Sequence, residues 1–144
     1  MSIIAGIMLM IFLIISAFTD FKERKIYLHI AVLFFIAGML INIMKLNINL
    51  VDAICGMSIG FLLIGLSFIT EEKIGKGDGI VFFVTGVYLG FFGNLLLLAM
   101  SVFLCACFSA GALIMKKADR NSRIPMIPFL IFPALYEIIM AGGL

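Results

Sequence analysis

The chain has 144 residues, of which 65% are hydrophobic and 12% are charged, and its mean hydropathy is +1.30. Soluble domains are about 45–50% apolar and about 25% charged, so this composition predicts an integral membrane protein. The net charge of +2 is small and dispersed, which argues against nucleic acid as a partner and makes the lipid bilayer the expected surroundings.

Apolar runs predict three helices in the first half of the chain. They lie at about Ile3–Thr19, Tyr27–Met44 and Asp52–Ile69, with Asp52 as the N-cap of the third. The first run has no basic residues before it and no A-x-A cleavage site, so it is expected to stay in place as a membrane helix.

The second half of the chain is expected to form three more helices. Ile80 to Met115 is apolar for 36 residues. As one helix this run would be about 54 Å long, too long for a hydrocarbon core of about 30 Å. It is therefore expected to fold back at Phe92-Gly93-Asn94, the most turn-like place in the run. A last helix should extend from about Pro125 to Met140, with a kinked start because of its prolines, and Glu137 near its end is expected to have a packing or snorkelling role.

The basic residues decide between six helices and five. With six, nine of the ten lysines and arginines lie in the loops after the first, third and fifth helices, and only Lys45 lies on the opposite side. Cytoplasmic loops carry such an excess of positive charge, so these three loops are predicted inside and both termini outside. An unbroken helix at 80–115 would move the last basic loop across the membrane. The sequence therefore predicts an all-α bundle of six transmembrane helices, forming one domain over residues 1–144.

Cysteine usage gives no sign of a metal site. Cys55, Cys105 and Cys107 all fall in apolar segments and form no C-x-x-C pair. A structural zinc site needs four ligands, commonly arranged in such pairs, so neither a metal nor another cofactor is expected. The three cysteines are expected to be lipid-facing or packing residues.

A polar stretch from Glu72 to Gly79 separates the third predicted helix from the fourth. Gly75, Gly77 and Gly79 lie within it, and because glycine lets another backbone approach closely, they are candidates for contact with a substrate. Asp78 starts the next helix, and in the predicted topology Asp20 ends the first helix on the same side of the membrane.

Helix capping is one role for this pair of aspartates, and catalysis is the other. Packed helix axes are about 8–10 Å apart, so two carboxylates at neighbouring helix ends can meet. Such a pair does not readily ionise at both groups. The ionised member can then take a proton from water while the protonated member polarises a peptide carbonyl, as in aspartyl proteases.

Three segments carry a further signal. The first is Asp20-Phe21-Lys22-Glu23-Arg24-Lys25-Ile26, the second is Gly75-Lys76-Gly77-Asp78, and the third is Ile127-Pro128-Phe129 with Pro133. They resemble the first aspartate motif, the G-x-G-D motif and the proline motif of the type IV prepilin peptidases, and the G-x-G-D motif also occurs in presenilin-like proteases. The family's usual Pro after Ile26 is Tyr27 here, and Gly79-Ile80 stands where the family has a Lys two residues after the aspartate.

The resemblance implies an aspartyl endopeptidase of the short form that lacks a methyltransferase region. Asp20 and Asp78 would be its catalytic residues. It would remove the basic leader from prepilin-like membrane proteins, cleaving after a Gly at the cytoplasmic face of a prokaryotic cytoplasmic membrane. Three alternatives stay open: a presenilin-like protease that cuts within a membrane helix, a proton-coupled carrier that uses the same carboxylates, and an inactive homologue that binds pilin-like partners.

Overall fold

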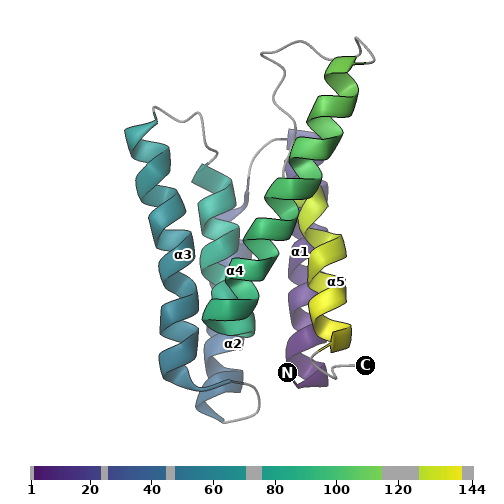
Figure 1. Ribbon diagram of the computed structural model, residues 1–144. Coiled ribbons are helices and arrows are strands. Elements are labelled where there is room, and N and C mark those ends of the chain that lie inside the picture. The colour runs from purple at the N-terminus through teal and green to yellow at the C-terminus, as the bar shows by residue number, and fades with distance from the viewer. Residues whose placement is uncertain (1, 24–25, 45–47, 71–75, 115–126, 141–144) are drawn as a thin grey trace.

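The computed structural model describes residues 2–23, 26–44, 48–70, 76–114 and 127–140, without the side chains at 23, 112 and 113. These residues form α1 (Ile3–Glu23), α2 (Leu28–Ile43), α3 (Leu50–Ile69), α4 (Lys76–Ile114), the 3-10 helix η1 (Ile127–Leu130) and α5 (Ile131–Met140) (Figure 1). The predicted all-α class is confirmed for the described part of the chain. Three helices, α1, α3 and α4, are long and apolar enough to cross a membrane, and α2 and the η1–α5 segment are shorter apolar helices.

The helix α4 consists of two helical halves that meet at Gly90. This residue has a φ of +72°, in the left-handed region that glycine adopts without the steric cost of a Cβ atom. In Figure 1 the first half of α4 (teal) descends in the view and the second half (green) rises again. The predicted count of six helices is not confirmed, since the described residues form five α-helices with this reversal inside the fourth. The predicted turn at Phe92-Gly93-Asn94 is wrong, because those residues are helical.

Side chains from two neighbouring helices bond the backbone groups that the reversal releases. Phe91 N–H donates to Asp52 Oδ1 of α3 at 3.0 Å, and the Val87 carbonyl accepts a hydrogen bond from Asn42 Nδ2 of α2 at 2.7 Å. Within a continuous helix these two backbone groups would bond each other. Asp52 therefore caps the second half of α4. The predicted role of Asp52 as N-cap of α3 is wrong, since Asn49 occupies that position.

Asn94 is fully buried in the second half of α4. Its Nδ2 donates to the carbonyls of Gly56 and Phe82 at 2.9 Å each, and its Oδ1 accepts a hydrogen bond from Thr85 Oγ1 at 2.7 Å. These bonds join the two halves of α4 to each other and to α3. In a medium that offers no water, a buried amide is stabilised by such interhelical bonds.

α3 packs along the first half of α4 through a glycine interface formed by Gly56, Gly60, Gly79 and Gly86. Gly56 and Gly60 are four positions apart, the spacing of small residues that lets two membrane helices approach closely. A Cβ atom at Gly56 would lie 2.5 Å from the Gly86 oxygen, so no larger residue fits there without moving a helix.

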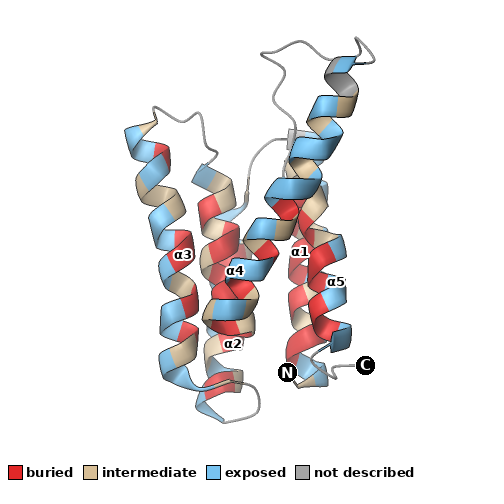
Figure 2. Ribbon diagram, in the orientation of Figure 1, coloured by how far each residue is buried: buried red, intermediate tan, exposed pale blue. Residues whose placement is uncertain are grey.

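The hydrophobic core lies between α1, α2, the first half of α4, η1 and α5. Its largest fully buried side chains include Leu9, Phe12, Phe82 and Tyr88. Buried residues face inward and exposed residues cover the outside in Figure 2. Large apolar side chains on the outside, such as Phe61 at 71% exposure, suit a surface that contacts lipid.

Candidate active site

The two aspartates predicted to act as a pair are held by different helix ends. Asp20 lies in the last turn of α1 and Asp78 in the first turn of α4. These helix ends lie at the same, upper end of the bundle in Figure 1. Both side chains are half-buried, the Oδ2 atom of Asp20 is buried, and the two carboxyl groups are close enough for their charges to interact. The fold therefore brings these two site residues together.

The residues on either side of Asp78 fix its position. Gly77 lies against Ile26, where an added Cβ atom would be 2.6 Å from the Ile26 Cδ1 atom. Gly79 lies against α3, where an added Cβ atom would be 2.6 Å from Ile64 Cγ1. Ile26 belongs to the same motif as Asp20, so its contact with Gly77 sets the two aspartate-bearing segments against each other. The third predicted glycine, Gly75, lies outside the described residues.

The second half of α4 returns to the aspartate pair. The Cys105 thiol lies close enough to Asp78 for the two groups to interact electrostatically. Cys105 is half-buried and follows the buried Ser101 by four residues, so the two share the inward face of the helix. From the sequence, Cys105 was expected only to face lipid or to pack in the core. No sequence signal marks it, because its position near Asp78 depends on the reversal at Gly90.

The segment with the proline motif packs against both helices that hold the aspartates. η1 contacts α1 and α4, with Ile127 and Leu130 fully buried. Phe129 of η1 lies with its ring centroid 5.3 Å from that of Phe108 in α4, and Pro133 of α5 is buried. The proline segment therefore supports α1 and α4 from the side opposite to α3.

Glu137 lies at the reversal of α4. It is 9% exposed, and its Oε2 atom is 2.7 Å from the place of a Cβ atom at Gly93. Its Oε1 atom is buried and accepts no hydrogen bond from the described residues. The predicted packing role fits this position better than snorkelling. In the part of the chain that the structure describes, no three His, Cys, Asp or Glu side chains come together as a metal site.

Two neighbouring carboxyl groups at the end of a helix bundle can carry out acid–base chemistry on a water molecule and a carbonyl group held between them. A comparison with protein families identifies the type IV leader peptidase family over residues 7–110, a range that includes both aspartates and ends before the proline segment. Neither the curated proteins nor the solved structures give a match. The matched range covers more than half of the chain, and the protein belongs to the type IV leader peptidase family.

Proposed function

We propose that this protein is a membrane aspartyl endopeptidase that removes the short basic leader from prepilin-like substrates at the cytoplasmic membrane boundary. Membership of the type IV leader peptidase family supports peptidase activity in general. The assignment of Asp20 and Asp78 as the catalytic pair is supported by their places in the last turn of α1 and the first turn of α4, at the same end of the bundle (Figure 1), where their carboxyl groups interact electrostatically.

The proposed reaction is hydrolysis of one peptide bond. The ionised carboxylate of the pair accepts a proton from water, and the water oxygen attacks the carbonyl carbon of the scissile bond. The protonated carboxyl group donates a hydrogen bond to the carbonyl oxygen and stabilises the charge that develops there. The leaving nitrogen then takes up a proton, the C–N bond breaks, and the leader is released with a new carboxyl terminus.

The glycines beside Asp78 have a positioning role in this proposal. Gly77 admits Ile26, and Gly79 admits the backbone of α3, so both let Asp78 approach Asp20 from a closely packed helix end. Direct contact of Gly75 with the substrate backbone stays a prediction. A peptide bond inside a helix is shielded by its own hydrogen bonds, so the scissile segment has to be extended when it reaches the pair.

The test is leader cleavage of a co-expressed prepilin-like substrate, detected by a gel shift. Asp20→Asn and Asp78→Asn preserve side-chain size and should each abolish cleavage while the protein remains in the membrane fraction. Asp52→Asn is the matched control, because asparagine retains an oxygen that can accept the Phe91 N–H bond at the reversal of α4. It should cleave like the wild type. Cleavage by either active-site variant would contradict the proposed pair.

A further inference from the structure

We propose that a groove between the second half of α4 and α5 holds the apolar helix of the substrate while its leader is cleaved. This inference rests on the proposed function. The groove has a volume of about 290 Å³ and is almost entirely apolar. Its lining residues are Met100, Phe103, Leu104, Phe132, Pro133 and Tyr136. We call this surface the α4–α5 groove.

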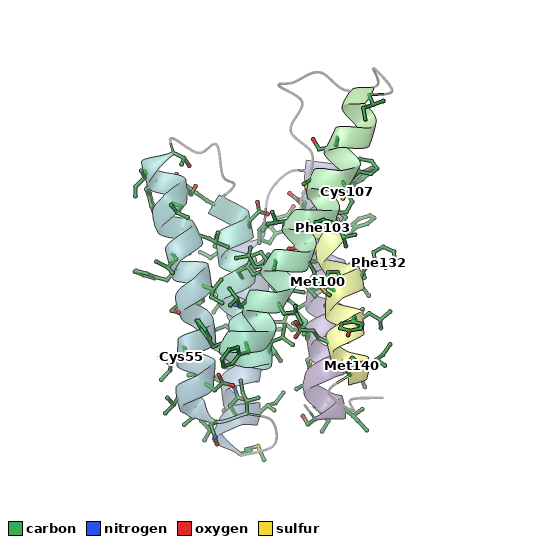
Figure 3. All side chains as sticks on the ribbon, viewed as in Figure 1. Cys55, Met100, Phe103, Cys107, Phe132 and Met140 are labelled. Atoms are coloured by element: carbon green, nitrogen blue, oxygen red, sulfur yellow. The ribbon has the colours of Figure 1, made fainter. Side chains whose placement is uncertain are left out.

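The lining residues form two facing helix surfaces. Met100, Phe103 and Leu104 have the i, i+3, i+4 spacing of one face of α4, and Figure 3 shows Met100 and Phe103 beside Phe132 of α5. Phe103 is 68% exposed and Phe132 is 74% exposed. The two rings project outward from a concave surface. That shape suits a further helix lying along α4 and α5, in the manner of one helix packing into the groove of others.

The groove lies next to the part of α4 that approaches Asp78. Leu104, which lines the groove, directly precedes Cys105, whose thiol interacts electrostatically with Asp78. At about 1.5 Å per residue, Met100 lies only about 7.5 Å from Cys105 along the axis of α4. When the scissile bond lies at the aspartates, the first two turns of the helix that follows this bond would therefore lie beside Met100 to Leu104.

The aromatic pair Phe108–Phe129 closes one end of the groove. Phe108 lies one turn after Leu104 in α4, and Phe129 of η1 lies about one turn before Phe132 of α5; the ring centroids are 5.3 Å apart. A helix in the groove cannot continue between α4 and η1 past these rings. Its chain must leave the groove there, at the level where Cys105 lies close to Asp78. This geometry fits a substrate whose apolar helix begins just after the cleaved bond.

The chemistry of the substrate and the exposure of α4 favour this occupant. In the proposed function the substrate is a prepilin-like membrane protein whose apolar membrane helix follows the cleaved leader, so an apolar surface close to the pair would receive that helix. Among the described side chains from Ser101 to Ile114, which leave out 112 and 113, only Ser101 is buried, and this end of α4 is largely pale blue in Figure 2. A larger groove that includes Asp52 and Phe92 lies at the reversal of α4, at the opposite end of the bundle from the pair.

Photo-crosslinking tests the position of the substrate helix. Phe103 and Phe132 are each replaced by p-benzoylphenylalanine in the full chain with Asp20→Asn, which retains uncleaved substrate, and Phe61 of α3 at 71% exposure is the matched control. Crosslinks from positions 103 and 132 to the first two helical turns after the scissile bond are the expected result. Equal crosslinking from position 61, or crosslinks only to lipid or to a second copy of the chain, would overturn the proposal.

Kinetics provide a second measurement that does not depend on the crosslinks. Leu104→Trp fills the groove from an exposed position and should raise KM for the helix-bearing substrate about tenfold, equivalent to about 1.4 kcal/mol, with little change in kcat. Leu62→Trp on the exposed face of α3 should change neither constant. Equal KM values in the Leu104→Trp and Leu62→Trp variants would overturn the proposal that the groove binds the substrate helix. Absence of cleavage by the wild-type protein would instead overturn the proposed function, and the groove with it.

Discussion

The close packing of α3 against α4 at Gly56 provides a stability prediction. Gly56→Ala and Gly65→Ala make the same chemical change on the same helix, α3. A Cβ atom at position 65 meets no other atom within 4 Å, whereas a Cβ atom at position 56 would lie 2.5 Å from the Gly86 oxygen. Both variants gain the same intrinsic helix propensity, about 1 kcal/mol, so this contribution cancels when they are compared.

The expected difference follows from the contacts at position 56. Ordinary van der Waals contact begins at 3.4 Å, so α3 and α4 must separate by about 0.9 Å to admit a Cβ atom that would otherwise lie at 2.5 Å. Overpacking of this kind costs about 1–3 kcal/mol. The bonds Asn94–Gly56 and Asp52–Phe91 cross the same interface, and a hydrogen bond of this kind contributes about 0.6 kcal/mol in membrane proteins. Gly56→Ala should therefore be about 2–4 kcal/mol less stable than Gly65→Ala.

The free energy of unfolding can be measured by pulse proteolysis across an SDS titration in mixed micelles. Gly65→Ala should unfold at the wild-type SDS concentration or above it, and Gly56→Ala well below it. Wild-type behaviour of both variants would refute the close approach of α3 to α4. Equal destabilisation of both would show that helix flexibility at glycine, rather than packing, determines the stability of α3.

Three further predictions concern polar and motif residues. Asn94→Ala should lower the free energy of unfolding by about 2–3 kcal/mol in the same titration, because three buried hydrogen bonds are lost. Asn49→Ala is the control: Asn49 is exposed and its side chain makes no capping hydrogen bond to α3, so the change should be less than about 0.5 kcal/mol. Equal losses would count against the Asn94 network. Gly77→Ala should reduce kcat/KM for leader cleavage about tenfold without affecting unfolding, because the new methyl group displaces Ile26 and with it the aspartate pair. Adding Ile26→Val, which removes the contacting Cδ1 atom, should restore much of the activity, and no recovery would exclude this contact as the cause. Glu137→Gln should leave the free energy of unfolding unchanged or raise it, since a buried carboxyl group is replaced by a neutral group of the same size. A decrease of more than about 1 kcal/mol would instead show that the charged carboxylate of Glu137 has a stabilising partner.

The meeting of Asp20 and Asp78 was predictable because it follows from topology. Each aspartate stands at the boundary between an apolar run and a polar stretch, which places a helix end beside it whatever the details of packing. The distribution of basic residues then assigns both ends to one side. Neither step requires knowledge of any side-chain contact, and the charge interaction between the two carboxyl groups agrees with this reasoning.

The position of the reversal in α4 was not predictable from the same signals. Within an apolar run of this length every face of a helix is apolar, so hydrophobic periodicity marks no residue as the bend. Gly90 and Gly93 both lie in that run, and either could allow the chain to reverse. The reversal occurs at Gly90 because Asp52 and Asn42 bond the Phe91 N–H and Val87 carbonyl groups that it releases. Asn94 pointed to a turn because asparagine favours turns in water. In this bundle it is buried instead and hydrogen-bonds across a helix interface.

Asp78 and the reversal at Gly90 lie at opposite ends of the first half of α4, yet the structure connects the reversal to the aspartate pair. The first half of α4 holds Asp78 and is fixed along its length by the glycine interface with α3. The second half holds Cys105 beside Asp78, and its direction is set at Gly90 and by the hydrogen bonds of Asn94. The second half is little buried beyond Ser101. The hydrogen bonds of Asn94 at its start therefore contribute strongly to holding Cys105 near the aspartate pair. Loosening the reversal would therefore displace the α4–α5 groove from the aspartates before it separated Asp20 from Asp78, whose segments are also joined through Ile26 and Gly77.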